Sequence, residues 1–166
     1  MLGICVSVLV GILLLVYLIP YITVLYNLNN ADRNYTSRVF ENNKNYFNDL
    51  TDDLLKLKDN YKKDIYISLD SDGDTWFLYE GDSLDFSYLN EEIANKIWFI
   101  SNQFEGESLD RIIIYSNQIS FSFEQNSYGV VYRKEDTKPL FMNYSSESFE
   151  ITTKKLDKYW YYCESK

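Results

Sequence analysis

Charge is absent from the first stretch of the chain, and hydrocarbon side chains dominate it. Between Leu2 and Tyr26 no side chain is charged, and the few polar residues follow no helical period. A helix of about 20 apolar residues crosses the hydrocarbon core of a bilayer, whereas a buried helix of a soluble protein would show a polar stripe. The pattern therefore predicts a transmembrane anchor over residues 1–26, which contacts the lipid bilayer through residues 2–26.

The flanks of this segment bear on its processing and its orientation. No Lys or Arg precedes it and no small-x-small cleavage site follows it, which favours a retained signal-anchor over a cleaved signal peptide. The nearest basic residues, Arg33, Arg38 and Lys44, favour a cytoplasmic domain on the positive-inside rule. A large trailing domain is translocated largely regardless of charge. We expect a single-pass protein of the cell membrane with an extracytoplasmic soluble domain, and the basic flank leaves the opposite orientation open.

A polar joint at residues 27–35 separates this segment from an amphipathic helix. Apolar residues recur at steps of three, four and seven from about Thr36 to Lys62, which is the period of a helix with one buried face. A second helix begins after Asn90, a helix-capping residue type, with Glu91 and Glu92 in its first turn. Its apolar face is formed by Ile93, Ile97, Ile100 and Phe104, and Trp98 and Phe99 broaden this face.

The remaining segments alternate apolar and polar residues with the period of strands. Ile65–Leu69 and Trp76–Glu80 flank a turn-forming sequence and predict a hairpin, and further alternating runs lie between Arg111 and Tyr162. We expect about six strands in an antiparallel sheet that packs with the two helices. The fold class predicted for the whole chain is thus α+β, with an N-terminal transmembrane helix and a soluble domain over residues 36–166.

The turn of the hairpin offers an alternative interpretation as a calcium loop. Asp70, Asp72 and Asp74 have the spacing of the first three ligands of an EF-hand. Gly73 stands at the fourth place rather than the sixth, Gly81 stands where the last ligand would be Glu, and strands flank the loop instead of helices. A hairpin turn is the favoured interpretation, and weak calcium binding stays open.

The charge of the chain bears on its partners. All 25 acidic and 16 basic residues follow the apolar segment, which gives the soluble domain the whole net charge of -9. That sign repels the phosphates of nucleic acid, so we expect no nucleic-acid partner. An acidic surface favours a protein partner with a basic surface, and the alternative is that it serves solubility alone.

Candidate chemistry is sparse. The chain has no His, and its two cysteines, Cys5 and Cys163, lie at opposite ends of the sequence. The commonest general base, the usual imidazole metal ligand and a Cys-rich zinc site are therefore missing. No glycine-rich phosphate loop is present either. We expect no catalytic residues, no metal site and no cofactor.

Aromatic residues are the compositional excess, at 17% of the chain with 16 Tyr. Such side chains give large contact areas at small entropic cost, which suits binding surfaces. In a strand over Tyr159, Trp160, Tyr161 and Tyr162, two aromatic rings must point away from the core. These four residues are the candidate binding site, and the alternative is that a helix or a loop covers their outer face.

In layout the chain resembles the small membrane-anchored immunity proteins of Gram-positive toxin systems. The likeness lies in size, in one N-terminal anchor, and in an acidic, aromatic domain that ends in a strand such as Trp160–Tyr162. The resemblance implies stoichiometric blocking of a secreted toxin, with acidic and Tyr residues at the interface. The expected function is that of a non-catalytic, membrane-tethered binding protein that neutralises a protein partner. The alternative functions are a structural or accessory subunit of a membrane protein complex and a ligand-sensing ectodomain.

Overall fold

The computed structural model describes residues 19, 34–69, 75–81, 87–104, 109–123, 128–135, 137, 139–141 and 151–165. The chain divides into two compact units, Met1–Tyr35 and Thr36–Lys166, and the second contains every strand described below. The strands are β1 (Ile65–Leu69), β2 (Trp76–Glu80), β3 (Ser87–Tyr88), β4 (Leu109–Ile114), β5 (Gln118–Phe123), β6 (Tyr128–Arg133), β7 (Ile151–Lys155) and β8 (Trp160–Ser165). Residues 34–58 are helical, and α2 spans Glu91–Ser101.

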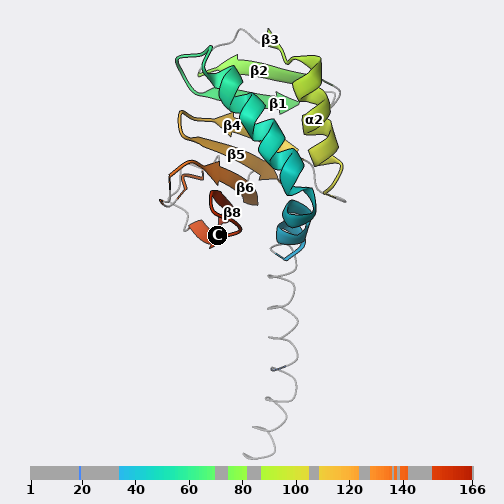
Figure 1. Cartoon of the computed structure of the whole chain (residues 1–166), viewed down its shortest axis with the longest axis vertical. Coiled ribbons are helices and arrows are strands. Elements are labelled where there is room, and N and C mark those ends of the chain that lie inside the picture. The colour runs from blue at the N-terminus through green and yellow to red at the C-terminus, as the bar shows by residue number, and fades with distance from the viewer. Residues whose placement is uncertain are drawn as a thin grey trace, which may run out of the picture. The chain divides into compact units, whose positions relative to one another are not determined.

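In the part of the chain that is described, all eight strands form one antiparallel sheet in the order β3-β2-β1-β4-β5-β6-β8-β7 (Figure 1). Most neighbours in the sheet follow one another along the chain, because short turns join antiparallel strands. There are two exceptions: β4 pairs with β1 in the middle of the sheet, and β8 pairs with β6 at one edge, where β7 is the outermost strand. The last strand of the chain is therefore an inner strand of the sheet.

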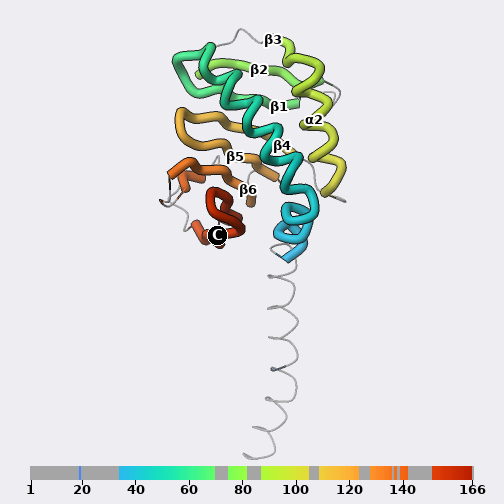
Figure 2. The backbone as a smooth tube through the Cα atoms, in the orientation of Figure 1, coloured from blue at the N-terminus to red at the C-terminus, as the bar shows by residue number. Residues whose placement is uncertain are grey.

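The 34–58 helix and α2 cover one face of the sheet (Figure 2). Phe47 lies at the centre of this layer, with its ring centroid 5.5 Å from that of Phe121 on β5 and 5.6 Å from that of Trp160 on β8. From α2, Ile97 and Ile100 are fully buried. Apolar side chains of the sheet are buried against the apolar faces of the two helices, and this burial stabilises the packing of the two layers.

The predicted fold needs correction in two respects. The sequence predicts about six strands, whereas the described residues form a sheet of eight, which includes the two-residue β3, too short to show an alternating pattern. The predicted fold also begins with a transmembrane helix. Among the described residues, however, no helix is long and apolar enough to cross a membrane. The predicted anchor, residues 1–26, lies outside the described residues apart from Ile19, and so does the 27–33 part of the polar joint.

Candidate protein-binding surface

The aromatic strand predicted as a binding site is largely core. Trp160 and Tyr162 point toward the helical layer, and their exposed fractions are 2% and 1%. The Trp160 ring centroid is 5.0 Å from that of Phe40 on the 34–58 helix. Tyr159, just before β8, is half-buried, with the Lys158 ammonium 4.8 Å from its ring centroid. Trp160 and Tyr162 thus belong to the core between the sheet and the helices.

The opposite face of β8 is also covered. Tyr161 and Cys163 belong to a small buried cluster with Val131 and Phe141, and Ile151 packs against it. Phe141 belongs to a loop segment, residues 139–141, that lies against this face of the sheet. A loop therefore covers the second face, as the alternative interpretation of the sequence expected.

Two local features hold this loop segment in place. Leu140 donates its backbone N–H to Gln118 Oε1 over 2.8 Å, and the Gln118 side-chain amide donates back to the Leu140 carbonyl. Gly129 leaves room for the Phe141 ring, because a Cβ there would lie 2.6 Å from a ring carbon. A Cβ at Gly129 would also clash with the Phe121 carbonyl oxygen on the neighbouring strand, so a larger residue there would disturb the pairing of β5 with β6 as well as the position of this segment.

Exposed aromatic rings lie instead on the outer side of the helical layer. Tyr46 on the 34–58 helix is 52% exposed and Phe99 on α2 is 36% exposed. Their ring centroids are only 4.1 Å apart, with an angle of 30° between the ring planes. The pair bridges the two helices and presents a joined aromatic surface to solvent.

An ion-pair cluster lies between the same two helices. Lys96 Nζ on α2 is 2.8 Å from Asp49 Oδ2 and 3.5 Å from Glu92 Oε1, and it also donates to Asp53 Oδ2. Hydrogen bonds to Asp49 and Asp53 raise the pKa of Lys96, and the hydrogen bond from Lys96 lowers the pKa of the Asp53 carboxyl. Three carboxylates thus face one ammonium, and the side chains of Asp49 and Glu92 remain 61% and 77% exposed.

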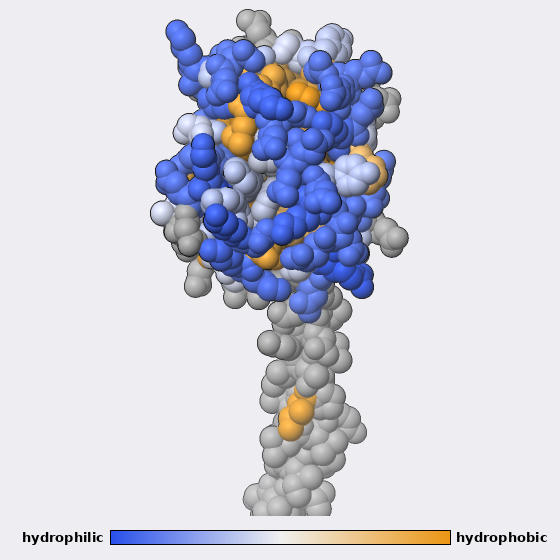
Figure 3. Space-filling model, in the orientation of Figure 1, coloured by the Kyte–Doolittle hydropathy of each residue, from blue (hydrophilic) through white to orange (hydrophobic). Residues whose placement is uncertain are grey.

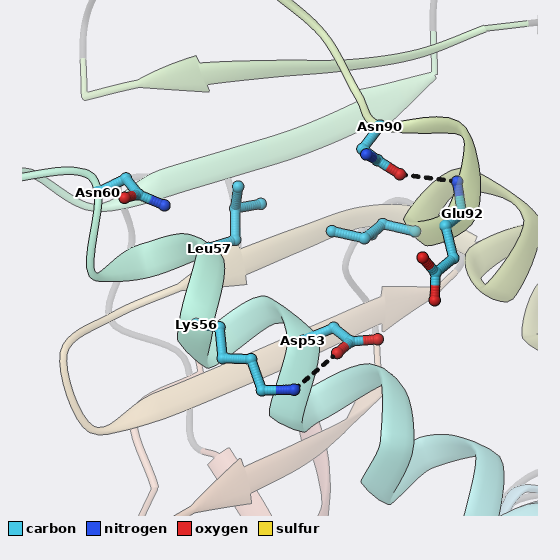
Figure 4. A pocket seen from close by; sticks show the side chains of 7 residues that line it. Asp53, Lys56, Leu57, Asn60, Asn90 and Glu92 are labelled. Atoms are coloured by element: carbon cyan, nitrogen blue, oxygen red, sulfur yellow. Dashed lines mark hydrogen bonds and ion pairs between the residues drawn. The ribbon is translucent and has the colours of Figure 1, made fainter.

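A hollow of about 280 Å³ adjoins this cluster (Figure 4). The 34–58 helix supplies Asp53, Lys56 and Leu57 to it, and the start of α2 supplies Glu92. Asn60, Asn90 and Ile93 complete the lining. Asp53 and Glu92 belong to both the cluster and the hollow. Tyr46 and Phe99 lie three residues from Asp49 and Lys96 on their helices, which makes them neighbours of the cluster, so the three features form one area. We call this area, formed by Tyr46, Asp49, Asp53, Glu92, Lys96, Phe99 and the hollow, the interhelical surface.

Its local structure follows from the sequence. Asn90 accepts a hydrogen bond from the Glu92 backbone N–H over 2.8 Å and caps α2, as predicted. Phe99 lies between Ile97 and Ile100 in the sequence, out of phase with the buried stripe of the helix, so it projects away from the sheet. The sequence interpretation placed Phe99 on the broadened apolar face of α2, and its 36% exposure corrects this, because its position is out of phase with Ile97 and Ile100.

Among the described residues no three His, Cys, Asp or Glu side chains are grouped as metal ligands would be. The possible calcium ligands Asp70, Asp72 and Asp74 lie outside the described residues. No family model, no curated protein and no solved structure matches this chain.

Proposed function

We propose that this chain is a non-catalytic binding protein that docks a protein partner with a basic surface on its interhelical surface. The observation that carries the proposal is the half-exposed Tyr46–Phe99 pair, held between two helices beside exposed carboxylates. Aromatic side chains on rigid elements are the usual anchors of protein interfaces, because they bury much area and lose little entropy.

Charge supports a basic partner. The chain carries a net charge of -9, and Asp49 and Glu92 extend exposed carboxylates beside the aromatic pair. The face of the Thr36–Lys166 unit seen in Figure 3 is mostly hydrophilic, with only small apolar areas. Electrostatic complementarity would therefore contribute to steering and specificity, and the aromatic pair would supply the apolar centre of the contact.

Neutralisation of a secreted toxin is the form of this function that the layout of the chain favours. A domain that blocks a toxin by occlusion needs a surface formed by regular elements, and the interhelical surface lies on two helices. The predicted contact with a lipid bilayer and the location at the cell membrane stay predictions, since residues 2–26 lie outside the described residues apart from Ile19. The alternative role, an accessory subunit of a membrane complex, differs in the partner that would be captured.

The test is capture by the immobilised full-length chain from two sources, the secreted proteins and the detergent-extracted membranes of the producing cells. Three proteins are compared: the wild type, a Tyr46→Ala/Phe99→Ala variant, and Tyr88→Ala as a control. Tyr88 is 79% exposed but lies on β3 at the sheet edge. We expect one basic secreted protein to be retained by the wild type and the control and lost by the double variant.

Salt and charge reversal provide the second readout. Retention should weaken as ionic strength rises, and Asp49→Lys should weaken it further at low salt. A partner retained equally by the wild type and the double variant would contradict the proposed surface. If a partner from the membrane extract is retained by the wild type and lost by the double variant, the proposed surface stands. The proposed role then becomes that of an accessory subunit of a membrane complex.

A further inference from the structure

The hollow of the interhelical surface lies between the last turns of the 34–58 helix and the start of α2 (Figure 4). Its volume of about 280 Å³ is just below the range of about 300–1,000 Å³ that is usual for pockets of small molecules and cofactors. The hollow is also open to solvent, because the side chains of Lys56 and Glu92 on its border are 75% and 77% exposed. A site of this size and openness fits one side chain of a docked protein rather than an enclosed ligand.

The lining of the hollow combines apolar walls with hydrogen-bond acceptors. Leu57 and Ile93 form the apolar walls, and both are half-buried. Asn60 and Asn90 supply side-chain carbonyl oxygens, and Glu92 supplies a carboxylate. Asn90 Oδ1 accepts the Glu92 N–H, but a carbonyl oxygen has two lone pairs and can accept a second hydrogen bond. The lining therefore suits a long side chain with an apolar stem and several donors at its tip.

The ion-pair cluster beside the hollow has one more negative than positive group. Asp53 accepts hydrogen bonds from Lys56 and from Lys96. Lys96 Nζ is 2.8 Å from Asp49 Oδ2 but 3.5 Å from Glu92 Oε1, and among the described residues no other cation pairs with Glu92. In Figure 4 the Glu92 carboxylate points into the gap between the two helices. Three carboxylates against two ammonium groups leave one negative charge, and the exposed Glu92 carboxylate carries it at the border of the hollow.

We propose that the protein partner inserts one arginine side chain into this hollow. The guanidinium group pairs with the Glu92 carboxylate, its remaining N–H groups donate to Asn60 and Asn90, and its methylene stem lies between Leu57 and Ile93. The added positive charge balances the cluster. The inference rests on the proposed function, because it names the group of the basic partner that contacts the interhelical surface.

Arginine suits this lining better than lysine. Its guanidinium group has five N–H donors in a planar fork and can meet acceptors from several side chains at once. A lysine ammonium is compact and strongly hydrated, so contact with the apolar walls would cost it more hydration. An anionic group is the competing occupant, because the first turn of α2 presents N–H groups, but Asp53 and Glu92 would repel it.

The affinity of the captured partner for variants of the full-length chain tests whether the hollow is used. Glu92→Gln removes the charge at the border, and Leu57→Trp fills the hollow without a change of charge. Each should raise the Kd about tenfold or more. Glu91→Gln is the matched control, because Glu91 is exposed in the same turn of α2 and does not line the hollow. It should change the Kd by less than about twofold. If Leu57→Trp does not fold, Glu92→Gln and its control decide.

The class of the inserted side chain is tested without the partner. The amides of Nα-acetylarginine, Nα-acetyllysine and Nα-acetylcitrulline, which has the shape of arginine without its charge, are titrated separately into the full-length chain. NMR follows the side-chain amide signals of Asn60 and Asn90. We expect the arginine compound to shift these signals in the wild type but not in Glu92→Gln, and the citrulline compound to leave them unchanged. No shift with the arginine compound, or a larger shift with the lysine compound, would overturn the proposal.

Failure of this inference is distinguishable from failure of the proposed function. The Tyr46→Ala/Phe99→Ala variant could lose the partner while Glu92→Gln and Leu57→Trp retain it with wild-type affinity. The arginine site would then be wrong, and the proposed function would stand. If all of these variants bind the partner as the wild type does, both are wrong. If no partner is captured, the proposed function fails and the titration alone decides on the arginine site.

Discussion

Trp160 Nε1 donates a hydrogen bond to Asn48 Oδ1, 2.9 Å away and 112 residues earlier in the chain. The bond joins the last strand to the middle of the 34–58 helix, and the Trp160 ring packs against Phe40 and Phe47 around it. Trp160, which the sequence suggested as a binding residue, therefore connects the 34–58 helix to the sheet.

We expect Asn48→Ala to lower the free energy of unfolding by about 1–2 kcal/mol, because it leaves the indole N–H of Trp160 without its acceptor. Asn48→Asp keeps an acceptor oxygen and should lower the free energy of unfolding by less. Urea unfolding followed by tryptophan fluorescence gives both values. Equal losses for the two variants would show that the hydrogen bond contributes little.

Removing the Phe141 ring should open the far face of β8. Cys163 is fully buried in the cluster that Phe141 covers, so its thiol is protected from reagents in the folded chain. Phe141→Ala should speed alkylation of Cys163 several-fold, measured by peptide mass spectrometry to separate it from Cys5. Leu140→Ala removes an exposed side chain and should leave the rate unchanged. The same slow rate in both variants would mean that the loop segment does not protect the strand.

Acid should remove the contribution of the Asp53 carboxylate to the stability of the folded chain. Its hydrogen bond from Lys96 lowers its pKa below the ordinary value of 3.8. A depressed folded-state pKa stabilises the protein above the unfolded-state pKa, and this stabilisation is lost as the pH falls through the folded-state value. Asp53→Asn should therefore melt a few degrees below the wild type at neutral pH and together with it in strong acid. Asp59→Asn, at the end of the same helix, is the charge-matched control. A constant difference at every pH would contradict this account of the ion-pair cluster.

The periodic elements could be predicted from the sequence. The cap of α2 at Asn90 and the buried positions Ile97 and Ile100 of its apolar stripe are confirmed, and so is the antiparallel pairing of β1 with β2. These elements depend on near neighbours, whose spacing the sequence shows directly. The first helix was predicted to reach Lys62, but its helical residues end at 58, because the apolar Tyr61 continues the period beyond the last turn.

The site could not be predicted in the same way, because it depends on contacts between distant segments. Nothing in the sequence pairs Gln118 with Leu140, yet these bonds hold the loop that hides Tyr161. Likewise Tyr46 and Phe99 are 53 positions apart, and only the packing of two helices brings their rings together. Tertiary packing alone decides that the aromatic strand β8 is buried on both faces. It also decides that the Tyr46–Phe99 pair between the helices is exposed.

Photo-crosslinking tests the proposed binding surface most directly. A benzophenone amino acid replaces either Tyr46, on the interhelical surface, or Tyr88, on the β3 edge, in the full-length chain, and each protein is irradiated with the captured partner. We predict that position 46 forms a covalent adduct with the partner and that position 88 does not. An adduct at position 88 with none at position 46 would place the binding surface on the sheet edge and contradict the account.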